Sequence, residues 1–163
     1  MLAAVAHLAV LRAAELRDAA TKLPRGGRRT RAVLEMLADQ FTSPVFTAAL
    51  ELWVAARTDA ALHGALVPLE QRIGREIHRQ TVELLGVDEQ QPGVRELVQA
   101  TLDLVRGLGL ANTISDDTAR RKRILDQWAH TLDDQIHHQP DSPAVALREP
   151  PGAAQTSRQE EQR

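Results

Sequence analysis

The chain has 163 residues, no cysteine and a formal net charge of −2 at pH 7, with 43% hydrophobic and 26% charged residues. These values are ordinary for a soluble globular protein, and they exclude a disulfide framework and thiolate chemistry. The near-neutral charge argues against a chain-wide electrostatic grip on nucleic acid or on an anionic membrane. Leu, Val, Ile and Ala dominate the apolar positions, which recur at helical spacing, so the sequence predicts an all-α fold.

The first predicted helix, residues 1–23, is apolar nearly all round and has no N-cap residue in front of it. Such a segment is typical of a helix inside a protein, so we expect either that a preceding region has been lost or that the protein lives without a region that its relatives have. The apolar stretch is too short to span a bilayer and lacks the preceding positive charge of a secretory signal. We therefore expect a cytoplasmic protein.

Three more helices are expected over residues 28–40, 44–57 and 59–86. Ser43 before Pro44 is a start signal, because Ser accepts a hydrogen bond from the first turn and Pro suits the first helical position. Asp59 caps the next helix in the same way, and Gly86 ends it. Pro68 lies inside this helix and predicts a kink or a short break there.

The last two predicted helices cover about residues 92–109 and 115–138, with Ser115 as the cap of the second. Both have wide apolar faces, and an antiparallel pair of this kind tends to pair with a second copy as a four-helix bundle across a twofold axis. Gly107 and Gly109 are expected to allow close packing at that seam. The predicted homodimer interface consists of Leu97, Leu104, Gly107, Leu108, Ile124, Leu125, Trp128, Leu132 and Ile136.

The folded domain is predicted to end at residue 138. Residues 139–163 hold four of the eight prolines and finish in a polar run. Such a tail cannot bury enough apolar surface to offset the entropy of ordering it, so we expect it to be disordered.

Residues 41–59, FTSPVFTAALELWVAARTD, resemble the C-terminal domain of TetR-family transcriptional regulators. Residues 66–70, LVPLE, and 103–108, DLVRGL, add to this resemblance, which covers about residues 1–136. It implies a six-helix domain that binds a small-molecule effector and dimerises through its last two helices. The family's N-terminal helix-turn-helix module has no counterpart in the chain, so the resemblance implies DNA contact only if that module is supplied upstream or by a partner.

Three of the four aromatic residues, Phe41, Phe46 and Trp53, fall in one short stretch. They are either ordinary core or the wall of the effector cavity that the resemblance implies, and we weigh these two readings about equally. The candidate pocket consists of Phe41, Phe46, Leu50, Trp53, Arg57, His63, Leu66, Thr101, Leu102 and Val105. Nothing in the sequence identifies the effector, and no cofactor is expected.

The remaining polar groups are expected to have structural or solvated roles. His130, Asp133, Asp134 and His137 recur at helical spacing, but we expect a solvated face rather than a metal site. The arginines at 25–31 are expected in a solvated loop, and those at 120–123 beside acidic partners. No catalytic set is assembled, so we predict a protein that is not an enzyme. The alternative to a regulator domain is a free-standing helical module that binds a ligand or disables full-length relatives by mixed dimerisation.

Overall fold

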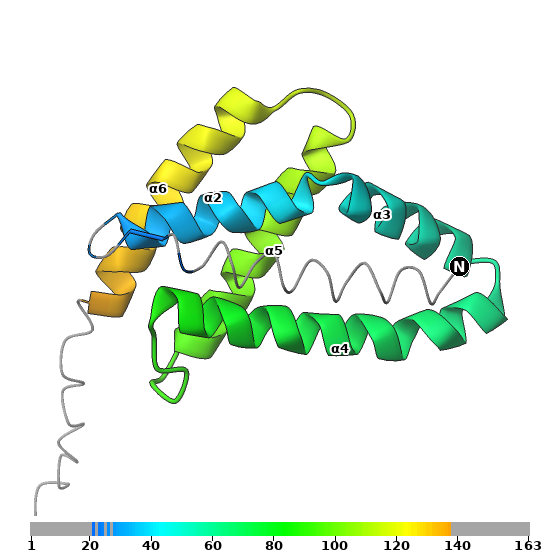
Figure 1. The fold of residues 1–163 in the computed structure, drawn as a ribbon, viewed down its shortest axis with the longest axis horizontal. Helices are drawn as coiled ribbons and strands as arrows, with labels where there is room; N and C mark the ends of the chain where they lie inside the picture. Colours follow the sequence, from blue (N-terminus) through cyan, green and yellow to red (C-terminus); the bar gives the residue numbers. More distant parts are fainter. Residues whose placement is uncertain (1–20, 22, 25, 27, 138–163) are drawn as a thin grey trace, which may run out of the picture.

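The computed structural model describes residues 21, 23, 24, 26 and 28–137. Within these residues the protein is all-α, as predicted, with no strand (Figure 1). The helices are α2 (Arg29–Phe41), α3 (Pro44–Ala56), α4 (Ala60–Leu85), α5 (Val94–Asn112) and α6 (Thr118–His137). The predicted helix over residues 1–23 lies outside the described residues except at Thr21 and Leu23, and the predicted tail lies wholly outside them.

The start and stop signals of α3 and α4 work as predicted. The Ser43 hydroxyl accepts a hydrogen bond from the backbone N–H of Phe46 at 3.3 Å, and Pro44 is the first helical residue. The Asp59 carboxylate accepts one from the N–H of Leu62 at 2.9 Å. Gly86 ends α4 in the left-handed conformation, with φ of 69°, which glycine adopts without steric cost.

Of the two outcomes predicted at Pro68, a kink or a short break, the break does not occur. Helix α4 runs from Ala60 to Leu85 through this proline (Figure 1). A proline leaves the carbonyl four residues earlier, here that of Gly64, without its helical donor. Both residues are exposed, so water can take the place of that donor.

Helix α6 begins at Thr118, two residues later than a cap at Ser115 predicts. The Asp116 carboxylate accepts a hydrogen bond from the backbone N–H of Thr118 at 3.0 Å. Hydrogen bonds from the Thr118 side chain and backbone lower the pKa of the Asp116 carboxyl below its ordinary value. The carboxylate is therefore charged at the positive end of the helix, where a negative group is favourable.

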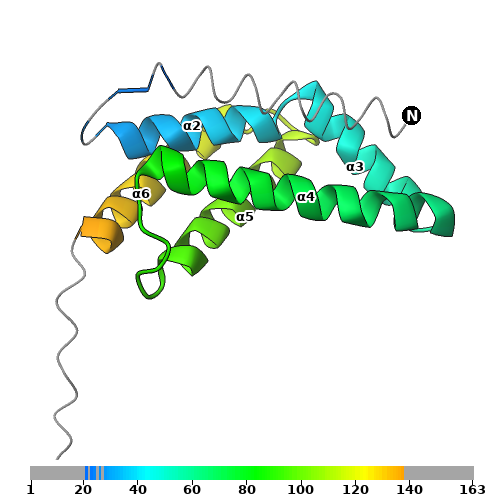
Figure 2. The ribbon, with the colours of Figure 1, turned by 60° about the horizontal axis from the view of Figure 1, so that its bottom comes forward.

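Helix α2 lies at the centre of the fold. It packs against α4, α5 and α6, whereas α3 packs mainly against α4. Figures 1 and 2 show α5 crossing α2, with α6 beside α5, while the turn between α3 and α4 extends away from them. The buried core consists of Val33, Leu34, Leu37, Ala38 and Phe41 of α2, with Phe46, Leu84, Leu102, Val105, Leu108, Leu125, Ala129 and Leu132.

Polar contacts fix the first turn of α2 to two other helices. The guanidinium of Arg29 donates to the carbonyl of Leu84 at 2.7 Å, near the end of α4. Thr30 donates to Asp133 of α6. Arg31 pairs with Asp126 and donates to the Lys122 carbonyl at 3.1 Å, also on α6. The prediction of a solvated loop was therefore wrong for Arg29 and Arg31, which belong to α2 and anchor it; Arg25 lies outside the described residues.

The other end of α2 is held by a close approach to α5. A Cβ atom placed on Gly109 would lie 2.2 Å from the carbonyl oxygen of Phe41 and 2.8 Å from its Cβ. Gly109 thus packs within its own chain and not at a dimer seam as predicted. Gly107, two residues earlier, has nothing within 4 Å of such a Cβ and is exposed, so it does not mediate close packing within the chain.

We predict that Gly109→Ala destabilises the protein, because the added methyl group meets the α2 backbone, which cannot move without disturbing the core. Overpacking of this kind costs about 1–3 kcal/mol of the free energy of unfolding, which urea denaturation measures. Gly107→Ala is the matched control and should be neutral or stabilising by up to about 1 kcal/mol, since Ala is the better helix former. Equal stability of Gly109→Ala and the unchanged protein would contradict this packing.

Candidate functional site

The three predicted aromatic residues form one row across the α2–α3 corner. The rings of Phe41 and Phe46 meet edge to face with centroids 5.2 Å apart, and those of Phe46 and Trp53 do so at 6.1 Å. The guanidinium carbon of Arg106 lies 5.5 Å from the Phe41 ring centroid, in cation–π geometry. The sequence-predicted group is therefore brought together, but Phe41 and Phe46 are also buried members of the core.

The other predicted pocket residues divide into two sets. Arg57 and His63 are exposed, so they are not enclosed with the aromatic row. Leu50 is half-buried and packs against the core. Leu66, Thr101, Leu102 and Val105 are buried. The Thr101 hydroxyl accepts a hydrogen bond from the indole N–H of Trp128 at 3.0 Å, so it binds α6 and not the aromatic row.

One donor in the aromatic row is unsatisfied. The indole Nε1 of Trp53 is buried and has no hydrogen-bond partner among the described residues. A buried N–H without an acceptor costs about 1–3 kcal/mol. A carbonyl or carboxylate oxygen of a bound molecule would satisfy it, which makes Trp53 the one member of the row with a chemical reason to meet a ligand.

A second feature lies on the outer side of α5 and α6, which is the side that faces away from α2. An open groove of about 640 Å³ runs between these helices, lined by Ala100, Asp103, Leu104, Ile124, Gln127 and Trp128. The hydrogen bond from Trp128 to Thr101 fixes the indole ring at the bottom of the groove, because Thr101 itself is fully buried. Sequence reasoning missed Ala100, Asp103 and Gln127 as lining residues.

The predicted dimer-interface residues fall on two different sides of the helix pair. Leu108, Leu125 and Leu132 are 5%, 2% and 0% exposed, because they face α2 in the chain's own core, so they have no surface to offer a second copy. Leu104, Ile124 and Trp128 line the groove. Leu97 and Ile136 are half-buried, and Gly107 is exposed. Six of the nine predicted interface residues therefore keep accessible surface in this chain: Leu97, Leu104, Gly107, Ile124, Trp128 and Ile136.

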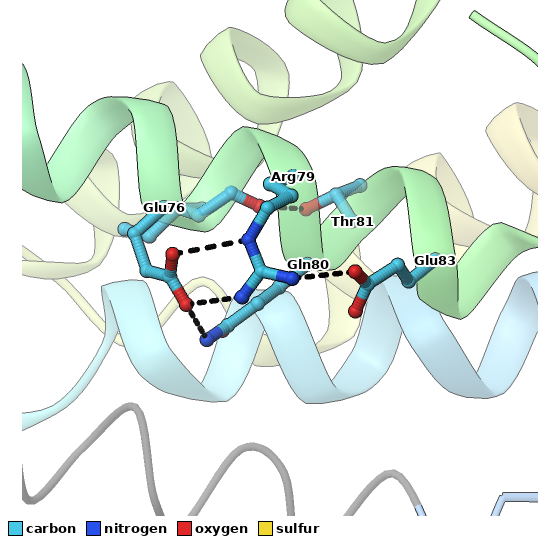
Figure 3. Close-up of polar contacts among 6 residues, drawn as sticks. Glu76, Arg79, Gln80, Thr81 and Glu83 are labelled. Atoms are coloured by element: carbon cyan, nitrogen blue, oxygen red, sulfur yellow. Dashed lines mark hydrogen bonds and ion pairs between the residues drawn. The ribbon is translucent and has the colours of Figure 1, made fainter.

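A charge network of Glu76, Arg79, Gln80 and Glu83 lies along α4 (Figure 3). Arg79 pairs with Glu76 at 2.7 Å and with Glu83 at 2.5 Å. Hydrogen bonding and charge from Glu76, with the charge of Glu83, raise the pKa of Arg79 above its usual range. Gln80 also donates to Glu76, at 2.6 Å. These are contacts between adjacent turns, which stabilise a helix and leave little chemistry for a substrate.

Two of the histidines have partners close to them in the sequence. His78 is part-buried and lies 2.9 Å from Glu89. The ring of His130 lies 2.7 Å from the Asp126 carbonyl. In the part of the chain that the structure describes, no three His, Asp or Glu side chains come together as metal ligands.

Comparisons of the chain with protein-family models, with curated proteins and with solved structures found no match. Among residues 28–137, none of the helices has an apolar stretch of the length that a membrane crossing requires.

We predict that Thr101→Val loosens the groove floor, because it leaves the half-buried Trp128 N–H without its acceptor. The loss should lower the free energy of unfolding by about 1–3 kcal/mol and shift the tryptophan fluorescence spectrum. Thr58→Val is the matched control. The Thr58 hydroxyl is exposed and bonds only to the Ala55 carbonyl, so its loss should change stability by less than about 0.5 kcal/mol. Unchanged stability and spectrum in Thr101→Val would refute the role of this bond.

Proposed function

We propose that this chain is the ligand-binding and dimerisation domain of a TetR-type transcriptional regulator, and that it acts as a homodimer paired through α5 and α6. Two things support the proposal: the resemblance carried by residues 41–59, 66–70 and 103–108, and the open apolar groove of the α5–α6 pair. The groove is the observation that carries it, because it leaves Leu104, Ile124 and Trp128 only half-covered on the outer side of the fold.

The groove favours a second copy over a small molecule as its occupant. It is wide open and runs between two helices, and its lining is mostly apolar, whereas a site for a small molecule encloses most of its ligand. In an isologous dimer the same strip is used twice, so the α5–α6 pair of each copy covers the strip of the other and completes a four-helix bundle.

The small-molecule effector is assigned to the aromatic row. Its edge-to-face rings offer apolar contact, and the unsatisfied indole N–H of Trp53 offers a hydrogen bond to an acceptor atom. Helix α3 packs mainly against α4, so it can shift with less disturbance of the core than α2 or α5 can. An effector that binds better to one position of α3 would then shift the population of the domain toward that position.

Regulation of DNA requires a helix-turn-helix module that is supplied upstream or by a partner, since the resemblance begins after that module. With that module present, the dimer would hold two helix-turn-helix modules, and the effector-binding domain would set the distance between them. This proposal needs no catalytic chemistry, cofactor or membrane partner.

The test is the self-association of the full chain by sedimentation equilibrium, for the unchanged protein and for Ala100→Glu. Ala100 is exposed and lines the groove, so Glu there should leave the fold intact while it forces a charge into the interface. We expect the unchanged protein to dimerise and the variant's dissociation constant to rise at least about tenfold, or about 1.4 kcal/mol.

Ala55→Glu is the matched control. Ala55 is equally an exposed helical alanine but lies on α3, away from the groove, so this variant should dimerise like the unchanged protein. A monomeric unchanged protein at about 100 μM would contradict the proposal, since specific homodimers of this kind associate more tightly than that. Equal dimerisation of the two variants would contradict the assignment of the groove.

A further inference from the structure

The charges of α6 are divided by position along the helix. Its first half carries four cations in a row, Arg120, Arg121, Lys122 and Arg123, together with Asp126, whereas its second half carries Asp133 and Asp134. Most of them already have partners within the chain. Arg120 pairs with Asp117, Arg121 with Asn112, Asp126 with Arg31, and Asp133 with Thr30.

The charged side chains of Lys122, Arg123 and Asp134 remain without such partners among the described residues, and Lys122 faces a different side of α6 from the other two. Arg123 and Asp134 are exposed, and neither makes an ion pair or hydrogen bond with its side chain among the described residues. They are 11 residues apart, which is three helical turns, so they lie on the same side of α6, about 16 Å apart along its axis. That distance is too long for them to pair with each other, so each is available to a group on another molecule.

The midpoint between these two charges falls at the groove. Arg123 lies five residues before Trp128, and Asp134 lies six residues after it. Gln127, which lines the groove, is on the same side of the helix as both charges, because steps of four and seven residues bring a helix back to nearly the same face. The charged pair thus brackets the groove symmetrically along α6.

From this arrangement we infer the register of the homodimer: the α6 helices of two copies pack antiparallel across a twofold axis at the level of Trp128 and Ala129, so that Arg123 of each copy pairs with Asp134 of the other. The inference rests on the proposed homodimer and adds to it the partner residues. A twofold axis at that point carries residue 123 of one copy onto the level of residue 134 of the other, and the two resulting ion pairs are identical by symmetry.

Charge complementarity also selects the direction of packing. Antiparallel α6 helices place the basic half of each copy beside the acidic half of the other, whereas parallel helices would place like charges together. The apolar strip supplies the attraction in either case, so these two rim pairs act mainly on specificity and register.

The test exchanges the charges between copies, using full-length Arg123→Glu and Asp134→Arg proteins singly and mixed. Alone, each variant brings like charges together twice in its homodimer, so its dissociation constant should rise roughly tenfold at low salt, with a smaller rise at high salt. In an equimolar mixture, the new glutamate of one protein would meet the new arginine of the other, and the original pair would form on the other side of the axis. The heterodimer should therefore recover the affinity of the unchanged protein to within about threefold.

Native mass spectrometry separates the heterodimer from the homodimers, and sedimentation gives the dissociation constants. Lys122→Glu is the matched control for the first variant, because Lys122 is the adjacent exposed cation but faces a different side of α6. Glu51→Arg, at an exposed acidic position of α3, is the control for the second. Both controls should dimerise like the unchanged protein.

The outcomes separate this inference from the proposed function. Weakened single variants with recovery on mixing support the antiparallel register. If the unchanged protein dimerises but mixing brings no recovery, the register is overturned while the homodimer stands. If the unchanged protein is a monomer, both the register and the homodimer are overturned.

Discussion

The described fold depends on the burial of one face of α2. Its apolar side chains are enclosed by α4, α5 and α6, and each fully buried Val or Leu contributes roughly 1.5–3 kcal/mol by leaving water. Both ends of the helix are fixed as well: the first turn by hydrogen bonds to α4 and α6, and the last turn by the glycine contact with α5. Because α2 packs against the inner sides of α5 and α6, the described residues leave the outer sides of these two helices for a partner.

The packing of α2 also links the two parts of the proposed function, which are the effector site and the dimer surface. Arg31 of α2 binds Asp126 and the Lys122 carbonyl of α6, and Asp126 is two residues from each of the groove residues Ile124 and Trp128. The other end of α2 carries Phe41, the first ring of the aromatic row. Helix α2 therefore connects the assigned effector site to the assigned dimer surface by direct contacts. In the proposed regulator, these contacts would pass a shift of α3 to the subunit interface.

The sequence was sufficient for features that depend on neighbouring residues. The caps at Ser43 and Asp59 and the stop at Gly86 are local chemistry, so their residue types predicted them. The aromatic row was also predictable, since Phe46 and Trp53 lie two turns apart on one helix and Phe41 just precedes it. The side chain that bonds the first turn of α6 was predicted to be that of Ser115 but is that of Asp116, because several residues there can accept a hydrogen bond.

Features that depend on distant residues were not predictable in the same way. Periodicity showed that α5 and α6 have wide apolar faces, but it did not show which part meets α2 and which part faces outward. Leu108, Leu125 and Leu132 were therefore assigned to a dimer surface although they fill the chain's own core. The partner of Gly109 and the anchoring role of Arg31 depend on helix crossings that no local pattern encodes.

The most direct test of the central claim, that the outer side of α5 and α6 pairs with a second copy about a twofold axis, is disulfide cross-linking of Gln127→Cys. The chain has no cysteine, so a single introduced thiol reports only on its own position. A residue beside a twofold axis meets its own copy, and a disulfide requires Cα atoms within about 7 Å. We predict a covalent dimer on mild oxidation of Gln127→Cys and none for Glu51→Cys on α3. No covalent dimer from Gln127→Cys, or equal cross-linking of both variants, would contradict the claim.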